Sequence, residues 1–420
     1  MVNYFGLNMD LLEKAVALEN EASEFGFQWE TTDQIMAQIQ SKCIKINEHL
    51  NKGIEQANQA ELQEEIGDLL HAVFSFRHVY PNKEGCVAKL LITLKNCYAS
   101  SSKPLNVLVS NPFHEGYLKV SSIHELRYAE YGNPKGVPVI VLHGGPGAGS
   151  SPHDATFFDL KYWRVILLDQ RGAGRSQPFT EIRENTTQDL INDIECLRNH
   201  LHIDQWVLFG GSWGSALALA YGETYPTKVK GFILRGLFLG REAETQQIWR
   251  GMRDIFPDAW QEMVDFLPKE EQADLEASFY KRILNPDRHI ALPAARALMK
   301  YDLTCAFLTA SSKTLDDMLN NETLILGVAR TFSHYAKNHY FLQPDQLMRH
   351  LEKINHLPLI LVNGRYDVIA IPKTAFLLHS KWPGSKLHIV EAAGHSAMEP
   401  KITSELINAT EEMKNLLKGN

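Results

Sequence analysis

A serine lies between glycines in the segment Gly-Gly-Ser-Trp-Gly-Ser at positions 210–215. The apolar run 206–209 before it is typical of a buried strand, and the small and apolar residues after it are typical of a helix packed on a sheet. A serine on such a sharp strand-to-helix turn is held above the sheet edge, and flanking glycines allow the strained backbone. The alternative is a Gly/Ser turn that merely closes a βα unit. We predict that Ser212 is a nucleophile.

The partners of a serine nucleophile are expected downstream, first an acid and then a histidine, each shortly after a strand. The apolar run 358–362 leads to Asp367, and the apolar run 387–390 leads to His395. A neutral imidazole can accept the serine proton, and a buried carboxylate can fix the imidazole tautomer. Either residue alone could be an ordinary turn residue. Their order and their positions after strands predict a Ser212–His395–Asp367 triad.

The tetrahedral intermediate of acyl transfer needs backbone N–H donors for its oxyanion. One should be Trp213, which follows the nucleophile. The second should come from the glycine-rich loop 143–149, which follows the apolar strand 137–142. We predict Gly145 as this donor, with Gly144 as the alternative and as a substrate contact. A dinucleotide site is disfavoured here, because the spacing is not Gly-x-Gly-x-x-Gly and Ser151-Pro152 should interrupt an immediate helix.

Taken together, these motifs resemble the proline iminopeptidase (prolyl aminopeptidase) family of α/β-hydrolase serine peptidases. The resemblance runs from about residue 113 to the C-terminus. It rests on His-Gly-Gly-Pro-Gly at 143–147, Asp-Gln-Arg-Gly at 169–172, Asn-Thr-Thr at 185–187 and Gly-Gly-Ser-Trp-Gly at 210–214. It implies a mostly parallel sheet with a helical cap. It also implies the release of N-terminal proline from short peptides, with no cofactor and no metal.

The resemblance further implies a substrate site, in which this sequence departs from the family. Arg235 and Phe238 match residues that position an acidic cluster and line the imino-ring pocket. Two cap glutamates bind the substrate α-amine in that family; Asp302 stands at the first position and Phe332 at the second. A charge-assisted bond contributes roughly 1.5–3 kcal/mol, so its loss could lower turnover about ten- to a hundredfold. We hypothesise intact chemistry with relaxed selectivity for a free N-terminus.

The first 97 residues have a different pattern, with apolar residues at helical spacing in 11–24, 32–50 and 61–79. The segment 61–74 resembles part of the MazG-type nucleoside triphosphate pyrophosphohydrolase motif. Glu65 and Asp68 match its Mg²⁺-binding acids, whereas 41–45 carries serine and lysines where further acids would lie. We predict an all-α MazG-like domain with a degenerate metal site that serves association, including homo-oligomer formation.

The chain has 420 residues, enough for two or three domains. A small polar stretch suggests a linker at 98–112. The hydrolase core should then occupy 113–239 and 342–420, interrupted by a helical cap at 240–341. Strands that alternate with helices imply right-handed crossovers and a mostly parallel sheet.

The composition excludes several other classes. A net charge of −8 and the absence of a Lys/Arg run disfavour nucleic acid binding. No apolar stretch approaches the roughly 20 residues that span a bilayer. The five cysteines are scattered without metal-ligand spacing and are typical of reduced thiols. The N-terminal residues do not have the pattern of a signal peptide, and these features together predict a cytoplasmic protein.

Two alternatives remain beside the aminopeptidase. A broader esterase or amidase on the same scaffold, acting on small amides or esters, is favoured by Phe332. A non-catalytic interaction protein would retain the fold, but the predicted triad and oxyanion loop argue against it. Haloalkane dehalogenase and epoxide hydrolase chemistry would need an acid at position 212 and is excluded.

Overall fold

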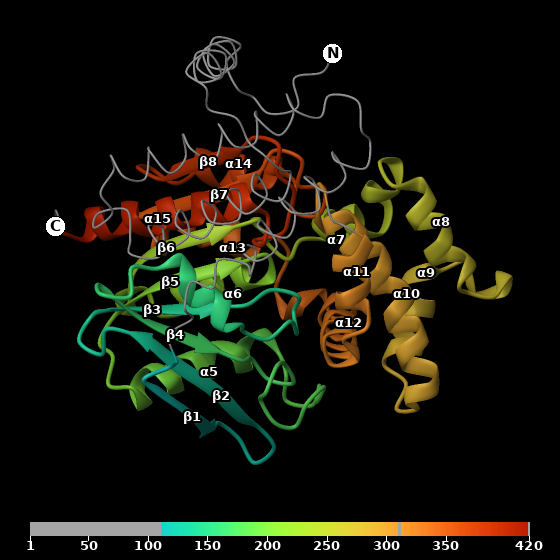
Figure 1. Ribbon diagram of the computed structural model, residues 1–420, viewed down its shortest axis with the longest axis horizontal. Helices are drawn as coiled ribbons and strands as arrows, with labels where there is room; N and C mark the ends of the chain where they lie inside the picture. Colours follow the sequence, from blue (N-terminus) through green and yellow to red (C-terminus); the bar gives the residue numbers. More distant parts are fainter. Residues whose placement is uncertain (1–110, 310–311, 419–420) are drawn as a thin grey trace, which may run out of the picture. The chain divides into compact units, whose positions relative to one another are not determined.

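The computed structural model describes residues 111–309 and 312–418 (Figure 1). The predictions for the N-terminal helical domain 1–97, with Glu65 and Asp68, lie outside the described residues, as does most of the predicted linker. None of the helices in the described ranges combines the length and hydrophobicity needed to cross a membrane.

An eight-stranded sheet lies at the centre of the described part of the chain, in the order β1-β2-β4-β3-β5-β6-β7-β8. β1 and β2 run antiparallel to their neighbours, and all later pairs are parallel. This confirms the predicted mostly parallel sheet of an α/β hydrolase. The strands are β1 (His114–Lys119), β2 (Glu125–Gly132), β3 (Val137–Leu142), β4 (Trp163–Leu168), β5 (Trp206–Gly211), β6 (Val229–Arg235), β7 (Leu359–Gly364) and β8 (Lys386–Val390).

Helices cover both faces of this sheet, which explains why its central strands are apolar throughout. Alternate residues of β5 separate into two cores, with Trp206 and Leu208 in one and Val207 and Phe209 in the other. The first core includes α5 (Thr187–His200), α6 (Trp213–Thr224) and α14 (Pro372–Ser380). The second includes α15 (Pro400–Lys418) and the 3-10 helix η1 (Pro152–Phe157).

The expectation that Ser151-Pro152 interrupts an immediate helix is wrong, because η1 begins at Pro152. Proline suits a first helical position, since it has no N–H group to leave unsatisfied there. Ser151 and Asp154 cap this helix reciprocally.

The chain forms a set of helices after β6 and before β7 in the sequence. Figure 1 shows the largest of these helices grouped beside the sheet. α10 is the central member and packs against α8, α9 and α12. The helices of this cap are α7 (Glu242–Gln246), α8 (Pro257–Asp265), α9 (Leu275–Ile283), α10 (Arg288–Ala306), α11 (Ser312–Leu319) and α12 (Glu322–Lys337). The short α13 (Gln346–Arg349) follows them before β7.

The Asn-Thr-Thr motif joins the cap to the core. The side-chain oxygen of Asn185 accepts a hydrogen bond from Tyr335 of α12 at 2.9 Å. Thr186 caps α5 together with Asp189, and Thr187 donates to the carbonyl of Tyr340. Three consecutive polar residues thereby hold a core helix and two cap segments in one arrangement.

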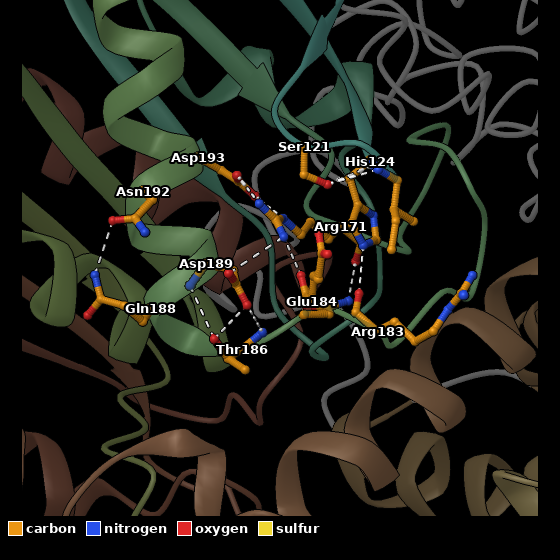
Figure 2. A network of polar contacts seen from close by, with 12 residues as sticks. Ser121, His124, Arg171, Arg183, Glu184, Thr186, Gln188, Asp189, Asn192 and Asp193 are labelled. Atoms are coloured by element: carbon orange, nitrogen blue, oxygen red, sulfur yellow. Dashed lines mark hydrogen bonds and ion pairs between the residues drawn. The ribbon is translucent and has the colours of Figure 1, made fainter.

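Arg171 fixes the start of this connection, in the polar network that Figure 2 shows. Its guanidinium binds both carboxylate oxygens of Asp193 on α5, at 2.6 and 2.7 Å. The same side chain donates to the carbonyl of Glu184, immediately before Asn185. The paired geometry is that of a strong arginine–carboxylate contact. The arginine of the Asp-Gln-Arg-Gly motif therefore has a structural role, tying the turn after β4 to α5.

Candidate active site

Ser212 occupies a strained turn between β5 and α6, with φ 55° and ψ −122°. Such backbone is unfavourable for a residue with a side chain and is held by the close packing around it. A Cβ on Gly210 would collide with the carbonyl oxygen of Gly214, and one on Gly214 would collide with that of Leu142. The two flanking glycines are required sterically, and the turn places Ser212 at the carboxyl end of β5.

The imidazole of His395 is oriented by Asp367. His395 Nδ1 and Asp367 Oδ2 are 2.8 Å apart, and the carboxylate is buried. The other carboxylate oxygen accepts hydrogen bonds from the N–H groups of Ile369 and Ala370, at 3.0 and 2.8 Å. An ionised Asp367 accepts at both oxygens, so Nδ1 carries the proton and Nε2 is left as the acceptor. This is the tautomer that a general base for serine requires.

Gly236 packs against this pair in the left-handed region, with φ +52°. A Cβ there would lie 3.0 Å from His395 Cε1 and 3.4 Å from Asp367 Oδ2. Both the backbone conformation and the available space therefore favour glycine.

The backbone of the histidine loop is held by the cap. The N–H groups of His395 and Ser396 both donate to the carbonyl of Ala306, the last residue of α10, at 3.0 Å. The buried Glu399 accepts from the N–H groups of Gly394, at 3.0 and 3.1 Å, and Leu308, at 3.0 Å. Glu399 thus joins the segment after α10 to the segment that carries the predicted catalytic histidine, His395. Sequence reasoning missed it; an acid four residues after His395 was the available signal.

Arg235, at the end of β6, contacts the same loop. Its Nη1 donates to the carbonyl of His395 at 2.6 Å and lies 3.4 Å from His395 Nε2. Burial lowers the pKa of Arg235, while the carboxylates of Asp367 and Asp154 oppose this effect. The structure thus places the guanidinium beside His395, a contact that the sequence did not indicate.

Among the described residues, no hydrogen bond joins Ser212 to His395, although both line the same cavity. Hydrogen bonds between a nucleophile and its base are often long without substrate and tighten in the reacting complex.

The loop predicted to supply an oxyanion donor lies directly against the nucleophile. A Cβ on Gly144 would lie 3.2 Å from Ser212 Cβ, and Gly145 has φ +110°. Within the described residues, neither the N–H of Gly145 nor that of Trp213 donates to a protein acceptor. Trp213 is the first residue of α6, where N–H groups have no partner inside the helix. Both groups are free to bind a developing oxyanion.

Gln170 links the two predicted donor segments. Its amide nitrogen donates to the carbonyl of His143 at 2.8 Å, and its amide oxygen accepts from Trp213 Nε1 at 3.0 Å. Its backbone N–H donates to His143 Nε2 at 3.0 Å. Burial lowers the pKa of His143, which keeps this ring neutral and able to accept. Sequence reasoning missed Gln170, although it belongs to the Asp-Gln-Arg-Gly motif.

A cavity of about 280 Å³ opens above Ser212. Apart from Asp367, which lies behind His395, it brings together every core and cap residue that the sequence analysis predicted for the site. These are Gly144, Gly145, Ser212, Trp213, Arg235, Phe238, Asp302, Phe332 and His395. The remaining wall is mainly apolar. Among the described residues, no group of three His, Cys, Asp or Glu could hold a metal ion.

In the part of the chain that the structure describes, Asp302 is the only carboxylate that lines this cavity. It lies on α10, is half-buried, and has no hydrogen-bond or salt-bridge partner among the described residues. Burial raises its pKa to about 6, with His395 acting in the opposite direction. Phe332 reaches the same cavity from α12 and is buried. The cavity thus offers one unpaired carboxylate in apolar surroundings.

The fold, the strained serine turn and the His–Asp pair define an α/β hydrolase with a serine nucleophile. Residues 137–401 match the family model described as alpha/beta hydrolase fold. An esterase from Exiguobacterium antarcticum has a similar fold, with a TM-score of 0.52 at 17% identity, covering 72% of this chain and 100% of the other.

The sequence comparison is more specific. The chain is 44% identical to a proline iminopeptidase of Arabidopsis thaliana over 309 residues, which cover 73% of this chain and 81% of the relative. It is also 44% identical to a probable proline iminopeptidase of Leptolyngbya boryana, covering 71% and 94%. The chain therefore belongs to the proline iminopeptidase family.

Proposed function

We propose that this protein is a serine aminopeptidase that releases an N-terminal proline, or a similar residue, from short peptides. The observation that carries this proposal is the unpaired carboxylate of Asp302 in an apolar cavity beside the catalytic histidine. A carboxylate without a protein partner is suited to bind the ammonium group of a free N-terminus. The names of the curated relatives point to the same activity.

The proposed reaction uses the chain's own groups. His395 Nε2 accepts the proton of Ser212 while the hydroxyl oxygen attacks the carbonyl carbon of the first residue. The N–H groups of Gly145 and Trp213 bind the resulting oxyanion. His395 then gives the proton to the leaving nitrogen, and water releases the acyl group by the same sequence of steps. Asp367 stabilises the imidazolium throughout.

The geometry of α10 supports the removal of a single residue. Asp302 and Ala306 are four positions apart on this helix, a rise of about 6 Å. The carbonyl of Ala306 holds the backbone of His395 at 3.0 Å. A substrate amine bound at Asp302 therefore leaves room for about one residue before the carbonyl carbon that reacts.

A broader esterase or amidase activity is the second candidate, favoured by Phe332. A buried phenyl ring stands where the resembling family carries a second amine-binding acid, and it cannot offset an ammonium charge. An acylated nitrogen avoids the cost of burying a charge. We therefore expect N-acylated substrates to be accepted as well.

The test is a substrate profile of the purified full-length protein. Prolyl arylamide, N-acetylprolyl arylamide and short esters are compared with and without a chelator, and the Ser212→Ala variant serves as the control. We expect turnover of both arylamides, within about a hundredfold of each other and insensitive to the chelator. An exclusive requirement for the free amine would refute the relaxed selectivity. Absence of both turnover and labelling by a fluorophosphonate probe would favour the non-catalytic interaction protein.

A further inference from the structure

The position of the leaving group follows from the proposed reaction. His395 must reach the leaving nitrogen to return the proton, so the residue after the scissile bond lies on the histidine side of the cavity. The chain that continues from His395 lines the cavity through Ser396, Ala397 and Met398. These residues therefore belong to the side of the cavity that we expect to face the second residue of the substrate.

This part of the wall is apolar and open to solvent. Met398 lines the cavity and still exposes 61% of its surface. Phe307 lines it from the segment after α10, and its neighbour Leu308 is 42% exposed. The 3.0 Å bond from Leu308 N to Glu399 brings that segment alongside the histidine loop. Two apolar segments, distant in sequence, thus meet at the rim of the cavity.

The apolar part of the wall carries no charged side chain of its own among the residues that the structure describes. Of the lining residues within 111–309 and 312–418, only Arg235, Asp302 and His395 have acidic, basic or imidazole side chains. Arg235 is engaged with the backbone of His395, and Asp302 is the proposed amine site. A charged side chain at the rim would lose water without gaining a partner, whereas an apolar one would cover exposed apolar surface. Methionine also adapts to apolar groups of different shapes.

We propose that Phe307, Ala397 and Met398 form a subsite for the side chain of the second substrate residue, and that this subsite selects apolar residues. The inference rests on the proposed aminopeptidase function and assigns the specificity of its leaving group. Met398 is the residue that sets this preference.

The test measures kcat/KM for a series of Pro-X-amides, with X as Leu, Met, Gly, Asp or Lys. The amidated C-terminus removes any contribution from a terminal carboxylate, and each value is divided by that for Pro-Gly-amide. In the wild-type protein we expect Leu and Met to exceed Asp and Lys by about five- to twentyfold. Met398→Ser should reduce this ratio to about threefold or less.

Two further variants sharpen the test. Met398→Lys should favour Asp over Lys at X by about two- to fivefold, because the new ammonium can pair with the substrate carboxylate. Phe376→Ser is the matched control, since Phe376 is 64% exposed on α14 and does not line the cavity. It should leave the wild-type ratios unchanged.

The outcomes separate the subsite from the proposed function. Hydrolysis of Pro-Gly-amide with equal rates for every X would refute the subsite and leave the aminopeptidase function standing. An apolar preference that persists in both Met398 variants would also refute it. If no Pro-X-amide is hydrolysed while the probe still labels Ser212, the aminopeptidase function and the subsite are both wrong.

Discussion

Replacing Asp302 with asparagine removes the charge proposed to bind the substrate amine and keeps the shape of the side chain. The carboxylate has no protein partner among the described residues, so the substitution breaks no hydrogen bond or ion pair within that part of the chain. A charge-assisted hydrogen bond contributes roughly 1.5–3 kcal/mol, which corresponds to about a ten- to a hundredfold change in rate. We expect kcat/KM for prolyl arylamide to fall by this factor, and the value for N-acetylprolyl arylamide to change by less than about threefold.

The same carboxylate should make amine selectivity depend on pH. Burial raises the pKa of Asp302 to about 6, and only the ionised form attracts an ammonium group. The ratio of free-amine to acylated turnover should therefore decline as the pH falls through about 6. Any titration of the catalytic residues affects both substrates and cancels in the ratio. Asp302→Asn should give a low ratio that is independent of pH.

The contribution of Asp302 to the stability of the substrate-free protein should change with pH in the direction opposite to the substrate ratio. A carboxyl group with a raised pKa binds its proton more tightly in the folded state than in the unfolded state. Its contribution to stability therefore declines as pH rises from the ordinary value of 3.8 to about 6. At pH 7 the ionised group costs up to about 3 kcal/mol, since each pKa unit corresponds to about 1.4 kcal/mol. Asp302→Asn should raise the free energy of unfolding at pH 7 by up to this amount.

The control for both measurements is Asp317→Asn, at an exposed acid on α11. It should alter neither the substrate ratio nor the thermal unfolding. An Asp302→Asn protein that loses activity equally on both arylamides would refute the amine site. One that is less stable than the wild type at pH 7 would refute the description of Asp302 as an unpaired, half-buried carboxylate whose ionisation costs stability.

Three further substitutions test other parts of the site. Glu399→Ala should lower kcat for both arylamides by about ten- to a hundredfold with little change in KM, because the loop of His395 loses its anchor. Glu399→Gln should restore part of the lost activity. An equal effect of the two variants on the rate of probe labelling would contradict this positioning role. Gly236→Ala should slow labelling of Ser212 by more than about tenfold. Gly384 is the control, because it also has a positive φ but has open space around it, and Gly384→Ala should not slow labelling. Comparable labelling of the two variants would show that contact with His395 is unimportant. Phe332→Glu should raise the ratio of free-amine to acylated turnover by about tenfold, and an unchanged ratio would remove Phe332 from the explanation of selectivity.

The sheet could be predicted because its signals are local. The strands β3, β5 and β7 are continuous apolar runs that end in glycine, histidine or acid-containing turns, and such runs are typical of strands buried on both faces. The order of the three predicted triad residues follows from the runs of β5, β7 and β8, since Ser212, Asp367 and His395 each come after one of them. Their meeting in space required only that parallel strands end at one edge of a sheet.

The supporting contacts could not be predicted, because they join segments that are far apart in the chain. Glu399 accepts a hydrogen bond from Leu308, 91 positions away, and Gln170 accepts one from Trp213, 43 positions away. Gln170 belongs to the Asp-Gln-Arg-Gly motif and Glu399 lies four residues after His395, but neither local pattern shows which distant groups the side chain will bind. The helix η1 was not expected because proline disrupts the interior of a helix, whereas it is well suited to the first helical position that Pro152 occupies.

The hydrogen bonds from His395 and Ser396 to Ala306 tie the cap to the proposed general base. Withdrawing α10 to admit a bulkier peptide would also release the backbone of the general base. Engineering that exchanges this cap with that of a relative should therefore retain the native stretch 302–308. Remodelling confined to α8, α9 and α11 leaves the base anchored and is the safer route to new substrates.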